Sequence, residues 1–417
     1  MPAGLSFRPL FNSLFRSFLL LALFGMAACV PPAVPPAVPP PPVVPELPVI
    51  PAPPPPPLKV PVFEAVSWER VEGWPGDEPG TALITFRQSC RAIGRKPPWE
   101  QVCAEAARID PIDEAAVLAF FSERFIPYRV SRPDGKETGL ITGYYVPDLA
   151  GSRTPSERFA WPLYRVPDDL LIIDLRSVYP DLANYRLRGR LEGRRVVPYW
   201  DRAAIDGEQA PLQGRELLWV EDPVELFFLH IQGSGRITLD NGERVMAHFA
   251  DQNGYPFRSI GKLLIERGEM TREQMSMQAI RAWARSHPEE TRSLLAENPS
   301  YVFFSELAAD DRPPPGALGV RLTAERSLAV DPRTIPLGAP VFLATTRPSS
   351  AVPLRRLMVA QDTGGAIKGE VRGDFFWGMG DAAGELAGRM KQQGRLWLLY
   401  PADALPAGAE QPETGKP

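Results

Sequence analysis

Two aspartates near the C-terminal end of the chain, Asp362 and Asp374, lie next to glycine-rich sequence. Asp362 ends an apolar run and opens the segment 363–369, whereas Asp374 follows Gly373 and precedes three aromatic residues. Glycines permit the backbone turns that bring strand ends together. Two carboxylates held close together cannot both ionise easily, so the pKa of one rises and that group can donate a proton near neutral pH. A carboxylic acid among aromatic side chains is therefore a candidate for protonating a glycosidic oxygen.

The same residues have two other interpretations. Aspartates beside glycines often cap turns, and on spacing alone this structural role stays open for Asp362, Asp374 and the earlier Asp331. The segment 364–369 also has the glycine content of a phosphate-binding loop. It lacks the spacing of a Walker sequence, so we do not expect a nucleotide.

The composition limits the remaining chemistry. The chain has 417 residues with 46 Lys and Arg against 50 Asp and Glu, and its net charge of −4 does not favour binding to nucleic-acid phosphates. Three histidines and three cysteines are too few and too scattered for a His/Cys metal site. We expect neither a metal nor another cofactor.

Cys90 and Cys103 can pair with each other if the chain is secreted. Their disulfide would close a loop of 14 residues. In the chain-entropy description such a loop contributes roughly 3 kcal/mol of stability. Two buried free thiols are the alternative.

The N-terminus has the pattern of a secretory signal, predicted at residues 1–28. Arg8 and Arg16 precede the apolar run 18–24, which is too short to span a bilayer, and small residues follow it. The sequence that ends in Cys29 resembles the lipobox of bacterial lipoproteins, in which the cysteine is acylated. Plain secretion with cleavage just before this cysteine is the alternative.

Residues 29–65 are predicted to be a proline-rich linker. The stretch 31–61 contains 17 prolines in 31 residues. Such a segment cannot pack a core and favours an extended polyproline II spacer of roughly 100 Å at most.

The elements that must position the two aspartates follow from apolar periodicity. Helices are predicted over 78–125, with Asp113 as an N-cap, and over 259–297, where Thr271 and Gln274 have capping-box spacing. The stretch 138–248 has short apolar runs broken by turn residues and should be mostly strand. Near the aspartates the pattern predicts one helix and four strands, at 381–392 and at 327–330, 340–345, 356–361 and 395–400.

Several short motifs follow one another over roughly 66–400. The C-terminal ones are Asp331-Pro332, 335–338 (IPLG), Asp362-Thr363-Gly364, 367–369 (IKG) and Asp374. The earlier ones are 142–145 (TGYY), 231–235 (IQGSG), 253–262 (NGYPFRSIGK) and 275–278 (MSMQ). In this order they resemble the membrane-bound lytic murein transglycosylase A family, and the C-terminal set resembles its "three aspartates" domain.

The resemblance implies a fold that is mainly β with accessory helices. A double-psi β-barrel domain, formed by 66–146 and 248–400, would have a second β-barrel domain, 147–247, inserted into it. The last residues, 401–417, are small, polar and proline-rich, and we expect a disordered tail.

The resemblance also implies an activity. The family cleaves the β-1,4 bond between N-acetylmuramic acid and N-acetylglucosamine in peptidoglycan, without water, and leaves a 1,6-anhydromuramyl end. Asp374 would be the single catalytic acid and base, Asp362 would tune its pKa and orientation, and Asp331 would support the barrel loops. Residues of both domains would line a groove for the glycan: Thr142, Tyr144, Tyr145, Gln232, Gly233, Ser234 and Gly235.

Two other functions stay open at this point. Asp362 and Asp374 would act as a pair in a glycoside hydrolase, with their carboxyl groups about 5 Å apart for retention or about 6.5–9.5 Å apart for inversion. A wall-binding module without activity is the second. The expected partners are peptidoglycan glycan strands and, through the lipid anchor, a membrane. The protein is expected as a monomer at the periplasmic face of the outer membrane, or in the periplasm, of a Gram-negative bacterium.

Overall fold

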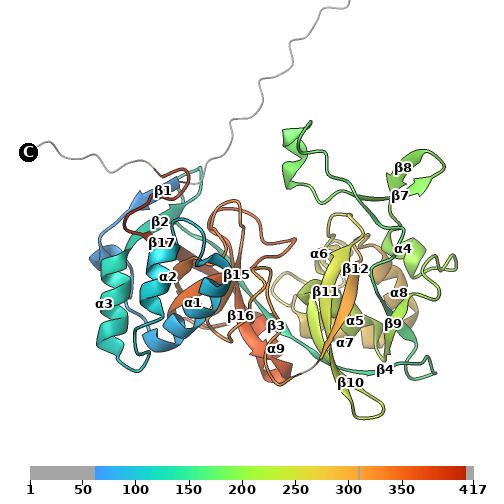
Figure 1. Cartoon of the computed structure of the whole chain (residues 1–417). Coiled ribbons are helices and arrows are strands. Elements are labelled where there is room, and N and C mark those ends of the chain that lie inside the picture. The colour runs from blue at the N-terminus through green and yellow to red at the C-terminus, as the bar shows by residue number, and fades with distance from the viewer. Residues whose placement is uncertain (1–61, 309, 410–417) are drawn as a thin grey trace, which may run out of the picture. The chain divides into compact units, whose positions relative to one another are not determined.

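The computed structural model describes residues 62–308 and 310–409, which are mainly β with accessory helices (Figure 1). The predicted signal peptide, the acylation site Cys29 and most of the proline-rich linker lie outside the described residues. Residues 410–417 of the predicted tail lie outside them as well.

Eight strands form one sheet, and six of them close into a barrel. The strand order is β1-β2-β17-β14-β15-β13-β16-β3, and β3 also pairs with β17, which closes the ring. The strands are β1 (Val62–Ala65), β2 (Phe125–Ser131), β3 (Gly139–Val146), β13 (Ser327–Val330), β14 (Pro340–Thr346), β15 (Pro353–Asp362), β16 (Gly373–Met379) and β17 (Lys391–Pro401). β14 is buried along almost its whole length, because its inner face lines the barrel and its outer face is covered.

Helices before β2 and between the last two strands pack on this barrel. They are η1 (Trp68–Arg70), α1 (Pro79–Ile93), α2 (Glu100–Ala106), α3 (Glu114–Arg124) and α9 (Gly380–Arg389). Asp113 caps α3 as predicted, accepting a hydrogen bond from Ala116 N at 3.0 Å. Cys90 of α1 and Cys103 of α2 form a disulfide, with their Cα atoms 5.5 Å apart. The disulfide joins the two helices that lie next to each other in the sequence.

A second β unit lies between β3 and β13 in the chain (Figure 1). Its six-stranded sheet has the order β12-β11-β10-β4-β9-β5, and a smaller sheet has the order β6-β7-β8. The strands are β4 (Asp148–Ser152), β5 (Trp161–Tyr164), β6 (Leu171–Ile172), β7 (Arg188–Glu192), β8 (Arg195–Pro198), β9 (Glu216–Val220), β10 (Ser234–Leu239), β11 (Arg244–Gln252) and β12 (Val302–Ala308). The helices are η2 (Pro180–Asn184), α4 (Arg202–Ile205), α5 (Pro223–Gln232), α6 (Ile260–Glu266), α7 (Met277–Ser286) and α8 (Pro288–Ala296).

The inserted unit extends further along the chain than the sequence predicted. β11 runs through His248, where we expected the return to the barrel, and it pairs with β10 on one side and β12 on the other. The three helices α6–α8 separate β12 from its partner in the sequence, so no local pattern marks β12 as part of this sheet. We propose 147–308 as the inserted domain in place of the predicted 147–247.

Both ends of the described chain contribute to the barrel sheet. Residues 62–65, assigned to the linker from the sequence, form β1 and pair with β2. Ala402 N donates to the carbonyl of Arg124 at the end of α3, and Ala409 forms a β-bridge with Phe63. The predicted disorder is therefore wrong for residues 401–409, because their backbone groups find partners in the barrel domain.

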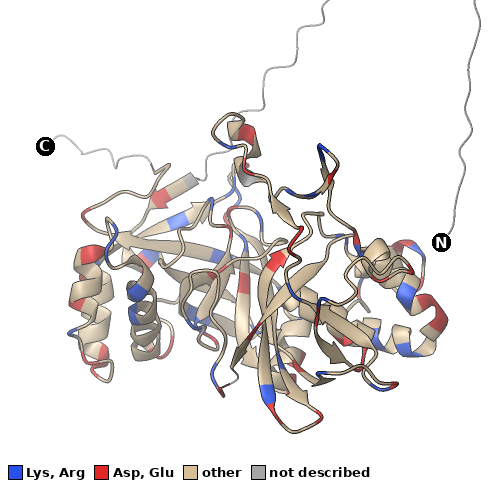
Figure 2. Cartoon of the chain, turned by 45° about the vertical axis from the view of Figure 1, so that its right-hand side comes forward, with Lys and Arg blue, Asp and Glu red and all other residues tan. Residues whose placement is uncertain are grey.

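Cationic and anionic residues are interspersed along the described helices and strands (Figure 2). Within the described part of the chain, none of the helices has both the length and the apolarity needed to cross a membrane.

Candidate active site

Asp374 lies on β16, which pairs with β13 on one side and with β3 on the other. Its register partners on these strands are Ala329 and Thr142. Residues directly opposite each other on neighbouring strands project to the same face of the sheet. The Thr142 hydroxyl accordingly donates to Asp374 Oδ1, at 2.5 Å. The pairing of β16 with β3 thus joins two residues that are 232 positions apart in the sequence.

The barrel changes the ionisation of Asp374. Burial raises the pKa of this carboxyl from 3.8 to about 6. The Arg372 guanidinium and the Thr142 hydroxyl oppose the rise, and Asp362 adds to it. A carboxyl group with a pKa near 6 is protonated at mildly acidic pH, so it can both donate a proton and take one back.

Asp362 lies at the end of β15, and both of its carboxylate oxygens accept hydrogen bonds from the protein. Its Oδ1 accepts from Ala317 N and from its neighbour Thr363 N, both at 2.9 Å. Its Oδ2 accepts from the Tyr144 hydroxyl at 3.0 Å. Burial raises the pKa of Asp362, and these three hydrogen bonds oppose the rise.

The two aspartates therefore differ in what they can offer a substrate. In the described part of the chain, Asp374 receives one hydrogen bond, from the Thr142 hydroxyl to Oδ1. Its Oδ2 accepts no hydrogen bond from the described residues. Asp362 instead holds the turn after β15 against the loop at Ala317.

The paired tyrosines that we expected in a glycan groove have different surroundings. Tyr144 packs on Phe376, with ring centroids 5.1 Å apart, and directs its hydroxyl to Asp362. Tyr145 is only 3% exposed, and its hydroxyl accepts a hydrogen bond from Arg281 at 3.2 Å. Tyr144 thus contacts the carboxylate of Asp362, whereas Tyr145 joins the barrel to α7 of the inserted domain.

The predicted binding segment Gln232, Gly233, Ser234 and Gly235 forms the turn from α5 to β10. Gln232 Oε1 accepts from Tyr145 N at 3.1 Å. Gly233 ends α5 in the left-handed conformation, at φ +81°, which strongly favours glycine. Ser234 Oγ lies 2.8 Å from His248 Nδ1 on β11. These contacts hold the turn against β3 and β11, and none of them reaches Asp374.

Asp331 has different hydrogen-bond partners from Asp362 and Asp374. It follows β13 and is 2% exposed, and burial alone would raise its pKa. Arg333 Nε donates to it at 2.9 Å and Gly369 N donates at 2.9 Å, so the pKa of Asp331 is instead lowered. The structure thus gives Asp331 contacts that tie together two loops of the barrel.

Arg372, two positions before Asp374, is a further residue of the site that was not predicted from the sequence. Its guanidinium donates to Thr142 Oγ1 at 2.8 Å and to the carbonyl of Leu140 at 3.2 Å. It therefore fixes the hydroxyl that contacts the acid and lowers the pKa of Asp374. An arginine so near a candidate acid was the available signal, but spacing alone does not tell which face of a strand it occupies.

Within residues 62–308 and 310–409, His, Cys, Asp and Glu side chains form no group of three or more that could hold a metal ion.

The inserted β domain and the barrel each match a known protein family. Residues 140–305 match the family described as the MltA specific insert domain, and residues 326–400 match the 3D domain. The membrane-bound lytic murein transglycosylase A of Escherichia coli K12 is 35% identical over 276 residues, which are 63% of this chain and 66% of that protein. The match thus spans just under two thirds of that relative's length.

Solved structures extend the match over most of the chain. MltA from Neisseria gonorrhoeae is 39% identical with a TM-score of 0.71, over 82% of this chain and 94% of that one. E. coli MltA with bound chitohexaose is 29% identical with a TM-score of 0.62, over 78% of this chain and 91% of that one. The chain therefore belongs to the membrane-bound lytic murein transglycosylase A family. The predicted fold class, mainly β with accessory helices and a double-psi β-barrel domain with a second β-barrel domain inserted, is confirmed.

Proposed function

We propose that this protein is a peptidoglycan lytic transglycosylase with Asp374 as its single acid and base. Membership of the family supports the activity, and the chitohexaose bound to the E. coli relative supports a glycan as the ligand. The observation that carries the catalytic role is the environment of Asp374, whose pKa is raised to about 6 by burial and whose Oδ2 accepts no hydrogen bond from the described residues.

The reaction would proceed in two steps at the bond between N-acetylmuramic acid and N-acetylglucosamine. In the first, protonated Asp374 donates its proton to the glycosidic oxygen as the bond from this oxygen to muramyl C1 breaks. In the second, the carboxylate takes the proton of the muramyl C6 hydroxyl while O6 forms a bond to C1. The proton is returned to Asp374, no water is consumed, and the product carries a 1,6-anhydro ring.

The neighbouring residues would keep Asp374 in its working state. Thr142 orients Oδ1, and Arg372 orients Thr142. Asp362, held by Tyr144, keeps a negative charge near Asp374 that favours the protonated form. Tyr145 and the turn 232–235 would act by holding the inserted domain against β3, and Asp331 by holding the loops.

The contacts of Asp362 favour transglycosylation over hydrolysis by a carboxylate pair. A retaining hydrolase needs a second carboxylate free to attack the sugar. Both oxygens of Asp362 are occupied by hydrogen bonds from Ala317, Thr363 and Tyr144. A wall-binding module would need no acid with a raised pKa.

The test is the mass of the muropeptides released from purified cell walls. Transglycosylation should give products lighter by one water than those of hydrolysis, because the sugar's own hydroxyl replaces water at C1. Reducing ends of ordinary mass would favour the hydrolase, and no release at all would favour the binding module.

We further propose that Cys29 is acylated and anchors the protein at the periplasmic face of the outer membrane through its proline-rich linker, with the enzyme acting as a monomer. Cys29 lies outside the described residues, and its sequence context supports this proposal. Cys29→Ala should move the protein from the membrane fraction to the soluble periplasm. Equal membrane association of both forms would contradict the anchor.

A further inference from the structure

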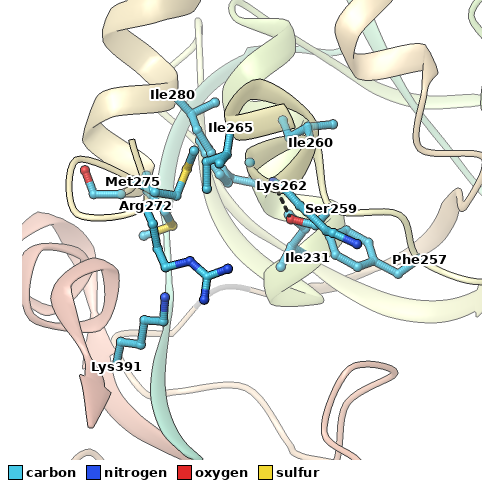
Figure 3. A pocket seen from close by; sticks show the side chains of 14 residues that line it. Ile231, Phe257, Ser259, Ile260, Lys262, Ile265, Arg272, Met275, Ile280 and Lys391 are labelled. Carbon is cyan, nitrogen blue, oxygen red and sulfur yellow. Dashed lines mark hydrogen bonds between the residues drawn. The ribbon is translucent and has the colours of Figure 1, made fainter. Parts of the chain in front are cut away.

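A cavity of about 380 Å³ is lined by the inserted domain and by Lys391 of the barrel (Figure 3). Its volume is in the range of small-ligand sites. Most of its wall is apolar and comes from the end of α5, from α6 and from the region around the start of α7, through Ile231, Ile265, Met275 and Ile280. Two cationic side chains, Arg272 and Lys391, are among its lining residues.

The cavity adjoins β17, which pairs with the strand that carries Thr142. Lys391 begins β17 and is in register with Thr142 on β3. Thr142 is in turn in register with Asp374, so these three side chains project from the same face of the barrel sheet. Met277, which also lines the cavity, lies close to α9 of the barrel domain. A Cβ added at Gly388 of α9 would lie only 3.0 Å from Met277 Cε.

The two cations lack carboxylate partners in the described part of the chain. Neither Arg272 nor Lys391 has an Asp or Glu oxygen within the 4.0 Å that defines an ion pair, whereas Lys262, also at the cavity, pairs with Glu266 at 3.5 Å. Glu273 is close enough for both cations to lower its pKa. It is, however, fully exposed, and its own backbone and the Thr271 hydroxyl lower that pKa more. Apolar walls with two unpaired cations suit a flexible anionic ligand that has alkyl parts.

We propose that this cavity binds a carboxylate of the peptide carried by the muramyl residue at the cleavage site. The proposal rests on the proposed function, because the peptide is attached to the same sugar whose bond Asp374 would cleave. An extended chain spans at most about 3.3–3.6 Å per residue, so two or three peptide residues reach roughly 10 Å from the sugar. Arg272 and Lys391 pair with the carboxylate, and the apolar wall receives the alkyl groups. Strands that carry peptides therefore bind more tightly than bare glycan strands.

The experiment compares two substrates with the full-length protein: purified peptidoglycan strands, and the same strands after an amidase has removed their peptides. The variant is Arg272→Ala/Lys391→Ala. Its KM for peptide-bearing strands should rise about 10-fold, since exposed charge pairs contribute modestly each, with kcat nearly retained. The ratio of the KM values for the two substrates, which favours peptide-bearing strands in the wild type, should approach one. Added salt should have the same effect on the wild type.

Two further variants serve as controls. Arg285→Ala removes an exposed cation of α7 that is not part of the cavity lining, and it should preserve the wild-type ratio. Arg272→Lys/Lys391→Arg keeps both charges and should restore most of the preference.

The outcomes separate this proposal from the proposed function. A wild type that forms anhydro products but shows the same KM for both substrates overturns the peptide pocket alone. Equal KM increases on both substrates in the double alanine variant also overturn it, because the cavity would then hold sugar. If the wild type forms no anhydro product from either substrate, the proposed function itself fails.

Discussion

Asp331 directly follows β13, and Asp374 lies on the neighbouring strand β16 of the same barrel. The pKa values of these two carboxyl groups shift in opposite directions. Asp331 follows Val330, which is in register with Gly373, the residue before Asp374. The pKa of Asp374 is raised to about 6, whereas that of Asp331 is lowered. In both cases burial acts to raise the pKa, so the direction of the burial effect alone does not explain the difference.

The difference lies in the hydrogen-bond donors around each carboxylate. Asp331 receives hydrogen bonds from the Arg333 guanidinium and from the backbone N–H of Gly369, which stabilise its charged form. Asp374 receives one hydrogen bond in the described structure, from a neutral hydroxyl, and Arg372 acts on it without a hydrogen bond. One fold thus contains a carboxylate that contacts two loops as an anion, and another whose pKa of about 6 suits the proton exchange of the proposed mechanism.

Replacing the poised carboxylate should have the largest effect. Asp374→Asn keeps the shape of the side chain but cannot donate and recover a proton, so anhydro-product formation should fall by about 10²–10⁴-fold or more. The measurement is the rate of product release from purified walls, with glycan binding as the control for folding. Near-normal activity would show that another group is the acid.

The same variant checks the ionisation of Asp374 by its stability. A raised pKa means that the contribution of Asp374 to stability is full below about pH 3.8 and is lost as the pH rises through about 6. Asn carries no such penalty, so the variant should be more stable than the wild type at pH 7–8, by at most ~3 kcal/mol, and should lose this advantage near pH 4. Thermal unfolding at both pH values measures it.

The anionic carboxylate should show the opposite behaviour. Asp331→Asn weakens the contacts with Arg333 and Gly369, and we expect a loss of about 1–3 kcal/mol in the free energy of unfolding at pH 7. Because the pKa of Asp331 is lowered, its contribution is present above pH 3.8 and declines as the pH falls below that value. Denaturant unfolding at pH 7 and pH 3 tests this. Unchanged stability at pH 7 would mean that its hydrogen bonds do not support the loops.

Replacing Arg372 should widen the difference between the pKa values of Asp374 and Asp331. Arg372→Gln removes the cation that lowers the pKa of Asp374, so that pKa should rise. In the proposed mechanism activity needs protonated Asp374, so its alkaline decline should move from near pH 6 to higher pH, by less than about one pH unit. Arg372→Lys keeps the charge and should leave the decline in place. An alkaline decline that moves to lower pH would contradict the assigned electrostatics.

Much of the fold was accessible from the sequence, since the strands of the barrel have continuous apolar runs. β13 has the predicted bounds, 327–330, and β9 and β10 lie where apolar runs predicted strands. The helix α5 was missed within a stretch expected to be mostly strand. Asp222 caps it and Pro223 occupies its first turn, which was the available signal. Its apolar residues are so continuous that a buried helix and a strand look alike.

The helix start predicted from the capping pattern at Thr271 and Gln274 was also misplaced. Thr271 and Gln274 make the predicted reciprocal hydrogen bonds, at 3.0 and 3.4 Å. They do so in a turn, while α7 begins at Met277 with Ser276 as its cap. The predicted hydrogen bonds between Thr271 and Gln274 are therefore confirmed, but no helix begins at these residues.

The candidate site could be predicted only in part. Asp374 and Asp362 were found because glycine-rich turns accompany them. The contact of Thr142 with Asp374 depends on the parallel pairing of β3 with β16, which no local pattern indicates. Tyr144 and Tyr145 were given one role from the sequence, and neighbouring strand residues face opposite sides, so only Tyr144 reaches the carboxylates.

The smallest expected effect concerns this tyrosine. Tyr144→Phe keeps the packing on Phe376 and removes the hydroxyl that donates to Asp362 Oδ2. Because that hydrogen bond stabilises the charged form of Asp362, its loss should raise the pKa of Asp362 and weaken the influence of its charge on Asp374. The activity should fall less than about 10-fold, as expected for one neutral donor, and its alkaline decline should move slightly to lower pH, opposite to Arg372→Gln. The pH–rate profiles of the two variants, measured side by side, provide the test. A loss as large as that of Asp374→Asn would show that the tyrosine hydroxyl itself takes part in proton transfer.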